Sequence, residues 1–204
     1  MALPKSQQTK LLFVVKFLIH AICLFLLFNL YYQAINDNLG ADPVEAVLHF
    51  TGIGAFNLLL LSLFITPLAK YAKQSLLLKF RRLLGLYSFS YAIFHLASFL
   101  AFEVQFDWEL FIDEIIDRPY ITVGMLALVI LFSLAVTSVS SLKRKMGKSW
   151  QKLHNGVYLA VILVSLHFYW SVKSEIIEPS IYIAITLTLL FLRKQKIKRF
   201  FKKH

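Results

Sequence analysis

The chain of 204 residues is 58% apolar and only 16% charged, and its mean hydropathy of +0.67 is far above that of ordinary soluble domains. This composition excludes a water-soluble globular domain. The single cysteine, Cys23, lies within an apolar run, which excludes a disulfide framework, a thiolate metal cluster and a C-x-x-C-H attachment motif. The formal charge of +11 is confined to a few segments, so we expect no nucleic-acid partner.

Six apolar segments are predicted to span a membrane, because about 20 helical residues cross the ~30 Å hydrocarbon core of a bilayer. They cover residues 11–32, 44–68, 83–102, 120–142, 150–171 and 179–192, of which the last is short. Backbone amides in lipid must be paired within their own segment, which favours helices. The sequence therefore predicts an all-α integral membrane protein, a six-span transmembrane helical bundle that forms a single domain over residues 1–204.

Most lysines and arginines lie in alternate connecting segments, and the segments between these are nearly free of both. These basic segments are residues 5–10, 70–82, 143–148 and 193–203. By the positive-inside rule they face the cytoplasm, and six spans then place both termini there. The acidic residues all fall in the opposite set of loops or at its edges, where they form either a docking face for a partner or ordinary solubilising charge. The basic carboxy-terminal tail is expected to anchor on anionic membrane lipid.

Histidines are the distinctive polar residues of the predicted spans. They are His20, His49, His95, His154 and His167. Ionisable side chains are costly in a membrane and usually functional. A proton or ion pathway would need carboxylates beside them, yet no acidic residue lies deep in a span, and Lys16 is the one basic residue near this depth. Neutral imidazole is a common axial ligand of heme iron, so the inventory favours heme over ion transport.

Depth within the spans separates the candidate ligands. At ~1.5 Å of rise per residue, His95 lies roughly 20 Å from the cytoplasmic edge of the third span, and His167 roughly 25 Å from that of the fifth. His154 lies only about 6 Å in. The sequence therefore predicts heme between spans 3 and 5, with His95 and His167 as axial ligands. His154 remains open as a ligand, as a neighbour of a flavin or quinone head, or as part of an interfacial aromatic belt.

Small side chains near these histidines suggest how the spans pack. Most residues on the helical face of His95 are small enough to admit a flat macrocycle. They are Ser88, Tyr91, Ala92 and Ser98. Gly52 and Gly54 form a small-residue patch suited to close helix packing. His20 and His49 have no obvious partner at their depth and are interpreted as packing or hydrogen-bonding residues.

Several segments carry a resemblance to a known family. They are ADPVEAVLHFTG (41–52), ITP (65–67), RRLLGLYSFSYAIFHL (81–96), DRPYITVG (117–124) and WQKLHNGVYLAVILVSLHFYW (150–170). Over nearly the whole chain they resemble the MsrQ (YedZ) family, the heme-binding membrane subunits of periplasmic methionine sulfoxide reductase systems. The most specific element is the pattern L-H-x12-H-F-x-W that begins at Leu153.

The resemblance implies a six-span member of the ferric reductase-like transmembrane superfamily, with b-type heme held by histidines of the third and fifth spans. These histidines correspond to His95, His167 and His154. Larger relatives carry two histidines on each of these helices, whereas Arg81 stands at the corresponding inner position in this chain. The resemblance therefore does not extend to a second heme with two histidine ligands.

The resemblance also implies bound FMN, electrons drawn from the respiratory quinone pool, and a periplasmic acceptor whose catalytic subunit contains molybdopterin. It implies a location in the bacterial inner (cytoplasmic) membrane. Arg81, Arg82 and Lys148, at the basic inner edge, are candidate ligands of the FMN phosphate. The two arginines are otherwise explained as determinants of topology.

Together these features predict an electron-transfer subunit that itself reduces no methionine sulfoxide, since its chemistry would be that of its cofactors. Two other functions remain open. One is a proton-coupled transporter that uses the intramembrane histidines, and the other is a stand-alone ferric or quinone reductase.

Overall fold

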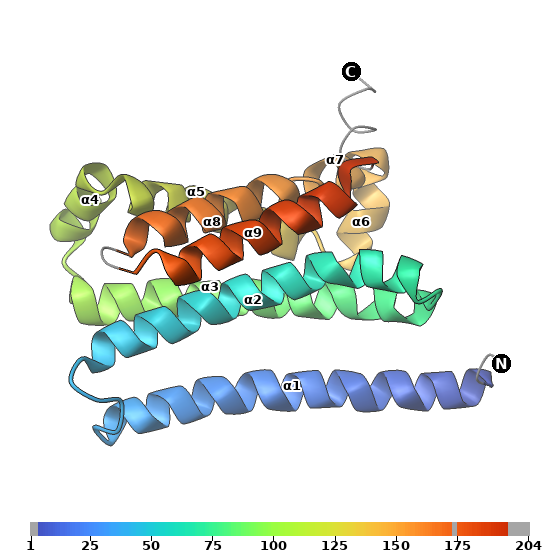
Figure 1. Ribbon diagram of the computed structural model, residues 1–204, viewed down its shortest axis with the longest axis horizontal. Coiled ribbons are helices and arrows are strands. Elements are labelled where there is room, and N and C mark those ends of the chain that lie inside the picture. The colour runs from blue at the N-terminus through green and yellow to red at the C-terminus, as the bar shows by residue number, and fades with distance from the viewer. Residues whose placement is uncertain (1–3, 173–174, 196–204) are drawn as a thin grey trace. The chain divides into compact units, whose positions relative to one another are not determined.

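The computed structural model describes residues 4–172 and 175–195 and contains helices but no strand in this part of the chain (Figure 1). The contacts divide the chain into two compact units, with the boundary between Glu103 and Val104. Each unit contributes one of the two predicted ligands, His95 or His167. The all-helical fold class is confirmed for the described residues.

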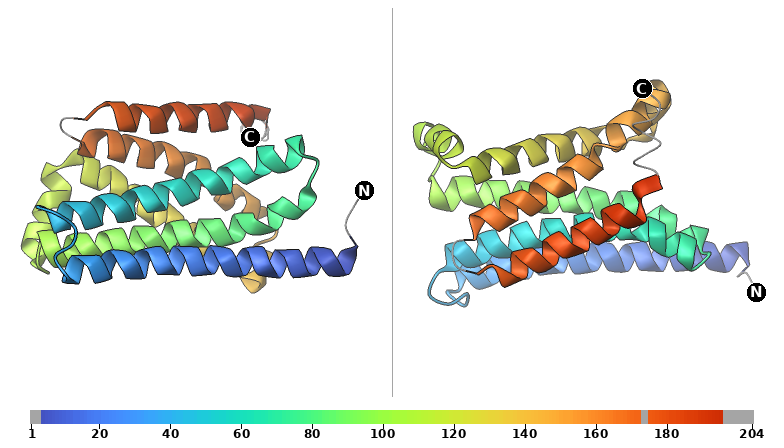
Figure 2. Two further views of the ribbon diagram at one scale, coloured as in Figure 1. Left: turned by 60° about the horizontal axis from the view of Figure 1, so that its bottom comes forward. Right: turned by 45° about the horizontal axis from the view of Figure 1, so that its top comes forward.

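The first unit is built from three long helices. Its elements are α1 (Lys5–Ile35), α2 (Pro43–Tyr71), the 3₁₀ helix η1 (Ser75–Phe80), α3 (Arg81–Ser98) and the π-helical turn η2 (Phe99–Glu103). The helix α2 begins where expected, because Asp42 accepts a hydrogen bond from the backbone N–H of Glu45 at 2.9 Å and Pro43 occupies the first turn. Helices α2 and α3 lie side by side (Figure 2).

A buried cluster joins the three helices of the first unit. It contains Cys23, Leu27, Ala55, Leu58, Leu84, Tyr87 and Tyr91. Hydrogen bonds cross the same interface: the Tyr91 hydroxyl donates to the Cys23 carbonyl at 2.8 Å, and the Ser88 hydroxyl donates to the Ala55 carbonyl at 2.9 Å. Such bonds and close contacts hold helices together in lipid, where apolar surface alone gives little drive to associate.

The second unit contains shorter helices. They are α4 (Trp108–Asp117), α5 (Pro119–Val136), α6 (Ser140–Met146), α7 (Lys148–His154), α8 (Val157–Ser171) and α9 (Ile177–Leu192). Helix α8 packs against α5 and α9. Helix α4 lies in the predicted connection between two spans. It begins at a regular N-cap, Asp107, whose carboxylate accepts from the N–H groups of Glu109 and Leu110.

Five described helical segments are long and apolar enough to cross a membrane. They are Lys5–Ile35, Pro43–Tyr71, Ser75–Glu103, Pro119–Val136 and Lys148–Ser171. Helix α9, with 16 residues, is apolar but shorter, about 24 Å at 1.5 Å per residue. The multi-pass architecture is confirmed for five spans, and the sixth span at 179–192 stays a prediction.

Two of the predicted spans differ in detail from the observed helices, although both contain a candidate span. The span 120–142 ends early, because α5 stops at Val136 and the carbonyl of Thr137 accepts a hydrogen bond from the Trp150 indole at 2.8 Å. The segment 150–171 is two helices, interrupted at Asn155 and Gly156. A Cβ on Gly156 would lie 2.9 Å from the Leu153 carbonyl oxygen, so this break depends on glycine.

Candidate functional site

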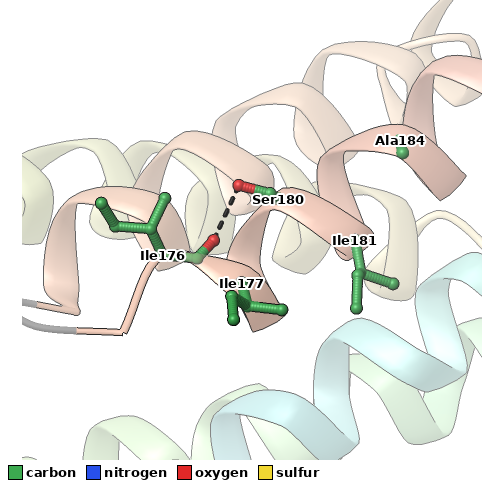
Figure 3. Close-up of a pocket in the computed structure, with 5 residues that line it drawn as sticks. All are labelled: Ile176, Ile177, Ser180, Ile181 and Ala184. Carbon is green, nitrogen blue, oxygen red and sulfur yellow. Dashed lines mark hydrogen bonds between the residues drawn. The ribbon is translucent and has the colours of Figure 1, made fainter.

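Two pockets in the described residues do not contain the predicted ligands. The first is lined by Ile176, Ile177, Ser180, Ile181 and Ala184 (Figure 3). Its one hydroxyl, on Ser180, donates to the Ile176 carbonyl at 2.7 Å, and its other lining residues are apolar. The second pocket, at the turn between α2 and η1, is lined by Thr66, Ala69, Lys70, Lys73, Ser75 and Leu78.

The predicted FMN ligands are not among the residues that line this second pocket. Arg81 begins α3 and is half-buried, while Arg82 beside it is exposed. Lys148 begins α7 in the second unit and is exposed. The pocket contains two lysines, Lys70 and Lys73, whose ammonium groups are equally suited to bind a phosphate. A phosphate-binding role for Arg81 and Arg82 stays a prediction.

His95 on α3 is oriented by the backbone of α2. Its Nδ1 lies 2.9 Å from the carbonyl oxygen of Leu48 and 3.3 Å from the hydroxyl oxygen of Thr51. A carbonyl oxygen can only accept, so Nδ1 carries the proton and Nε2 carries the lone pair. This is the tautomer that a histidine uses to ligate a metal through Nε2, with its other nitrogen donating to a backbone carbonyl.

His167 on α8 is held in the same way by α5. Its Nδ1 lies 2.7 Å from the carbonyl oxygen of Tyr120, which again places the proton on Nδ1 and the lone pair on Nε2. The Tyr120 ring also contacts the imidazole, with ring centroids 6.0 Å apart. The two histidines that the sequence predicts as a ligand pair therefore share one tautomer and one kind of support.

A glycine lies beneath each imidazole. A Cβ on Gly52 would be 3.2 Å from Nδ1 and Cε1 of His95, and a Cβ on Gly124 would be 2.7 Å from Nδ1 of His167. Each ring thus rests against the backbone of the neighbouring helix. We refer to each carbonyl and glycine pair as an imidazole cradle: Leu48 and Gly52 for His95, and Tyr120 and Gly124 for His167.

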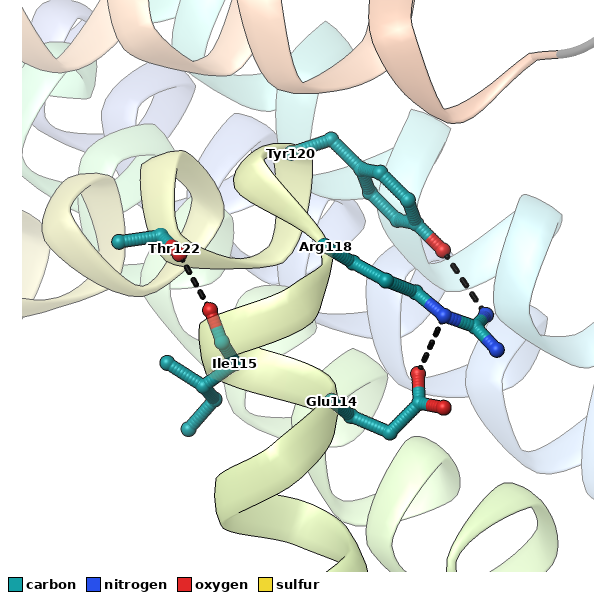
Figure 4. Close-up of polar contacts among 5 residues, drawn as sticks. All are labelled: Glu114, Ile115, Arg118, Tyr120 and Thr122. Atoms are coloured by element: carbon teal, nitrogen blue, oxygen red, sulfur yellow. Dashed lines mark hydrogen bonds and ion pairs between the residues drawn. The ribbon is translucent and has the colours of Figure 1, made fainter.

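The carbonyl of the second cradle is positioned by the turn between α4 and α5 (Figure 4). Arg118 forms an ion pair with Glu114 at 2.8 Å and donates to the Tyr120 hydroxyl at 3.2 Å. The Thr122 hydroxyl donates to the Ile115 carbonyl. These contacts fix the first turn of α5, from which the Tyr120 carbonyl reaches His167.

His154 forms its hydrogen bond through Nε2, whereas His95 and His167 use Nδ1. Its Nε2 lies 3.1 Å from the hydroxyl oxygen of Thr137, which itself donates to the Ser133 carbonyl at 2.6 Å. The hydroxyl therefore accepts from His154, so Nε2 carries the proton. The ring also stacks on Trp150, with centroids 3.9 Å apart. His154 thus has the opposite tautomer to His95 and His167, within the contacts that connect α7 to the end of α5.

The residues expected to border the macrocycle have another role. Ser88, Tyr91 and Ser98 are buried and hydrogen-bond to α1 or α2, the last through the Tyr31 hydroxyl at 2.8 Å. These three side chains therefore take part in the packing of α3 against α1 and α2, and a heme beside them stays a prediction. Ala92 is half-buried and packs against the same cluster.

His20 has a partner that the sequence analysis did not find. Its Nδ1 lies 2.6 Å from the hydroxyl oxygen of Tyr87, and the two rings meet edge to face. The interpretation of His20 as a hydrogen-bonding residue is confirmed, and its lack of a partner is wrong. The pairing depends on α1 and α3 running side by side, which spacing alone does not reveal. His49 is exposed on α2.

Comparison with known families decides the class of the protein. Residues 51–165, more than half of the chain, match the family model of the ferric reductase like transmembrane component. The chain belongs to this family. The matched stretch contains His95, His154 and both cradle glycines, while His167 lies two residues beyond its end. With five candidate spans, this ferric reductase-like chain is a multi-pass membrane protein with a role in transmembrane electron transfer.

The ferric reductase-like family generally binds heme, and the residues of this chain fit that group. Two half-buried imidazoles have their Nδ1 protons directed to backbone carbonyls, the support that metal-ligating histidines usually have. Within residues 4–172 and 175–195, no group of three His, Cys, Asp or Glu side chains is arranged to hold a metal ion.

Proposed function

We propose that this protein is the heme b subunit that carries electrons across a bacterial inner membrane to a periplasmic methionine sulfoxide reductase. The observation that carries the proposal is the pair of matching imidazole cradles around His95 and His167. Membership of the ferric reductase-like family supports the electron-transfer role, and the resemblance to MsrQ supports the choice of acceptor.

In this proposal the protein supplies ligation, orientation and a dry environment. His95 and His167 present Nε2 lone pairs, because their Nδ1 protons are directed to the carbonyls of Leu48 and Tyr120. Heme, when bound, supplies one-electron redox chemistry. The hydrogen bond at Nδ1 makes each imidazole a stronger electron donor, and the apolar spans exclude water from the ligands.

The remaining partners follow from the same proposal. Electrons come from the quinone pool, with FMN as a second cofactor near the basic inner edge, and the termini are cytoplasmic. The acceptor is a soluble molybdopterin-containing catalytic subunit on the opposite side. Helix α4 supports this docking face, because it presents the exposed carboxylates of Glu109, Asp113 and Asp117 beside the exposed Trp108.

The first test is a dithionite-reduced minus oxidised absorption spectrum of the detergent-purified protein, with heme and flavin quantified in the same sample. We expect a sharp b-type α-band, because two histidine ligands give low-spin heme. A folded but colourless protein from heme-replete cells would overturn the proposal and favour proton-coupled transport.

A second measurement separates the proposed acceptor from a stand-alone reductase. Reduced protein is mixed anaerobically with a purified periplasmic molybdopterin reductase and methionine sulfoxide, and the α-band is followed. With the reductase in trace amount, we expect complete reoxidation only when both additions are present. Equal reoxidation by a ferric chelate alone would identify a stand-alone ferric reductase instead.

The role of His154 can be ranked against the other two histidines. We expect His154→Ala to lose less heme per protein than either His95→Ala or His167→Ala, because Nε2 of His154 donates to Thr137. The measurement is heme per folded protein by the pyridine hemochrome method. Thr137→Val serves as the control, since it removes the acceptor but keeps the imidazole. A heme loss in His154→Ala as large as in His95→Ala would show that His154 is an axial ligand.

A further inference from the structure

The two imidazole cradles have the same spacing along the chain. In each, a carbonyl at position n accepts from a histidine at n+47, and a glycine at n+4 lies under the ring. The positions are Leu48, Gly52 and His95 in the first unit, and Tyr120, Gly124 and His167 in the second. A constant offset of 72 residues relates the two sets. The same local device therefore occurs once in each unit.

The glycines are required by space rather than by backbone conformation. Neither Gly52 nor Gly124 has a positive φ, and both lie inside helices, where glycine is less favourable than alanine. An added Cβ at Gly52 would need the His95 ring to move by a few tenths of an ångström. At Gly124 it would lie 2.7 Å from Nδ1 and 2.9 Å from Cε1 of His167, which no ordinary contact allows.

The cradles differ at the residue before each glycine. Thr51 is fully buried, and its hydroxyl donates to the Val47 carbonyl at 2.7 Å while lying 3.3 Å from Nδ1 of His95. The corresponding residue in the second unit is Val123, which has no hydroxyl. The N–H of His95 therefore has two oxygen neighbours. The N–H of His167 donates to the Tyr120 carbonyl over a shorter distance, 2.7 Å.

We propose that Gly52 and Gly124 are positioning residues that set the electron-donor strength of the two axial imidazoles. Each lets its histidine approach the carbonyl closely enough for a strong Nδ1–H hydrogen bond. A side chain at Gly124 is tolerated less well than one at Gly52, because a Cβ would lie 2.7 Å from His167 but 3.2 Å from His95. This inference rests on the proposed heme ligation by His95 and His167, but the hydrogen bonds themselves can be measured without heme.

The variants Gly52→Ala, Gly124→Ala and Gly85→Ala test the proposal. Gly85 is the matched control, since it lies within α3 and a Cβ there would meet nothing within 4 Å. We expect Gly52→Ala to keep its heme with a raised midpoint potential, because a weaker hydrogen bond makes the imidazole a poorer donor to ferric iron. We expect Gly124→Ala to lose most of its heme, and Gly85→Ala to match the parent in both properties.

The midpoint potential of Gly52→Ala distinguishes a weakened hydrogen bond at His95 from a general loosening of the site. A loosened site that admits water would lower the potential of Gly52→Ala, so a lowered value would overturn the proposal. Parent-like heme content and potential in both Gly52→Ala and Gly124→Ala would also overturn it. A change in Gly85→Ala as large as in Gly52→Ala would do the same, because it would show that the measurement responds to any helix substitution.

A second readout uses the heme-free protein. With ¹⁵N-labelled histidine, nuclear magnetic resonance reports which ring nitrogen carries the proton. We expect the Nδ1–H tautomer at His95 and His167 in the parent, and its loss at His167 in Gly124→Ala. If the parent binds no heme yet shows this pattern, the proposed function fails while the cradles stand. An Nε2–H tautomer at both histidines of the parent would overturn the inference itself.

Discussion

Replacement of His95 or of His167 by alanine is expected to remove the b-type absorption of the protein. Each change deletes a half-buried imidazole whose Nδ1 is held by a carbonyl at 2.9 or 2.7 Å. Loss of an outer-shell partner alone typically weakens a metal site 10–100-fold, and loss of the ligand itself is more severe. We therefore expect heme per protein to fall to about a tenth of the parent value or less, measured as pyridine hemochrome.

His49→Ala is the matched control for this prediction. His49 also lies in a predicted span, on α2, but is exposed and adjoins the cradle carbonyl of Leu48 in sequence. It should keep the heme of the parent, since the backbone carbonyl does not depend on the His49 side chain. Unchanged heme content and α-band in both His95→Ala and His167→Ala would show that the ligand assignment is wrong.

Folding must be checked in the same samples. The contact between α2 and α3 does not depend on the His95 ring alone, because Ser88 donates to the Ala55 carbonyl and Tyr91 packs on Gly54. His95→Ala should therefore elute as the parent does in size-exclusion chromatography and keep its helical circular dichroism. Heme loss with retained helicity is then a property of the ligand.

Hydropathy predicted the spans well because a bilayer imposes one rule on the backbone, that its amides be paired within the segment. The predicted and observed courses agree closely for α2, at 44–68 and Pro43–Tyr71. The predicted and observed courses differ where a side chain bonds to a backbone group at a helix end. An example is the Trp150 indole, which donates to the Thr137 carbonyl just after α5 ends at Val136. An apolar count cannot detect such a bond between residues 13 positions apart.

The candidate ligands could be found from the sequence because histidine is conspicuous in an apolar span. Their supports could not, because the acceptor of His95 lies 47 residues earlier and is a backbone atom, which leaves no trace in residue identity. A glycine in a span is the one sequence feature that marks these supports, because it allows a close neighbour. Gly52 was assigned to close helix packing, and the close neighbour proved to be the His95 imidazole. Gly124 has the same role beside His167, which its place in the sequence did not reveal.

Gly54→Ala is expected to destabilise the first unit strongly. A Cβ there would lie 2.5 Å from Cδ1 and 2.7 Å from Cε1 of Tyr91. Tyr91 is 2% exposed, and its hydroxyl donates to the Cys23 carbonyl, so the ring cannot turn aside without breaking the bond to α1. Overpacking typically costs about 1–3 kcal/mol, and a lost hydrogen bond adds about 1 kcal/mol. The measurement is unfolding in a denaturing detergent, followed by circular dichroism.

Gly85→Ala is the matched control, because a Cβ at Gly85 meets nothing within 4 Å, and it should stabilise helix α3 by roughly 0.5–1 kcal/mol. The opposite signs distinguish a steric role of Gly54 from a general response to alanine. In a double-mutant cycle, Tyr91→Leu should recover part of the loss in Gly54→Ala, since the smaller side chain gives the new methyl group room. Equal destabilisation by Gly54→Ala with and without Tyr91→Leu would show that the two residues are not in contact, and that α2 and α3 pack differently.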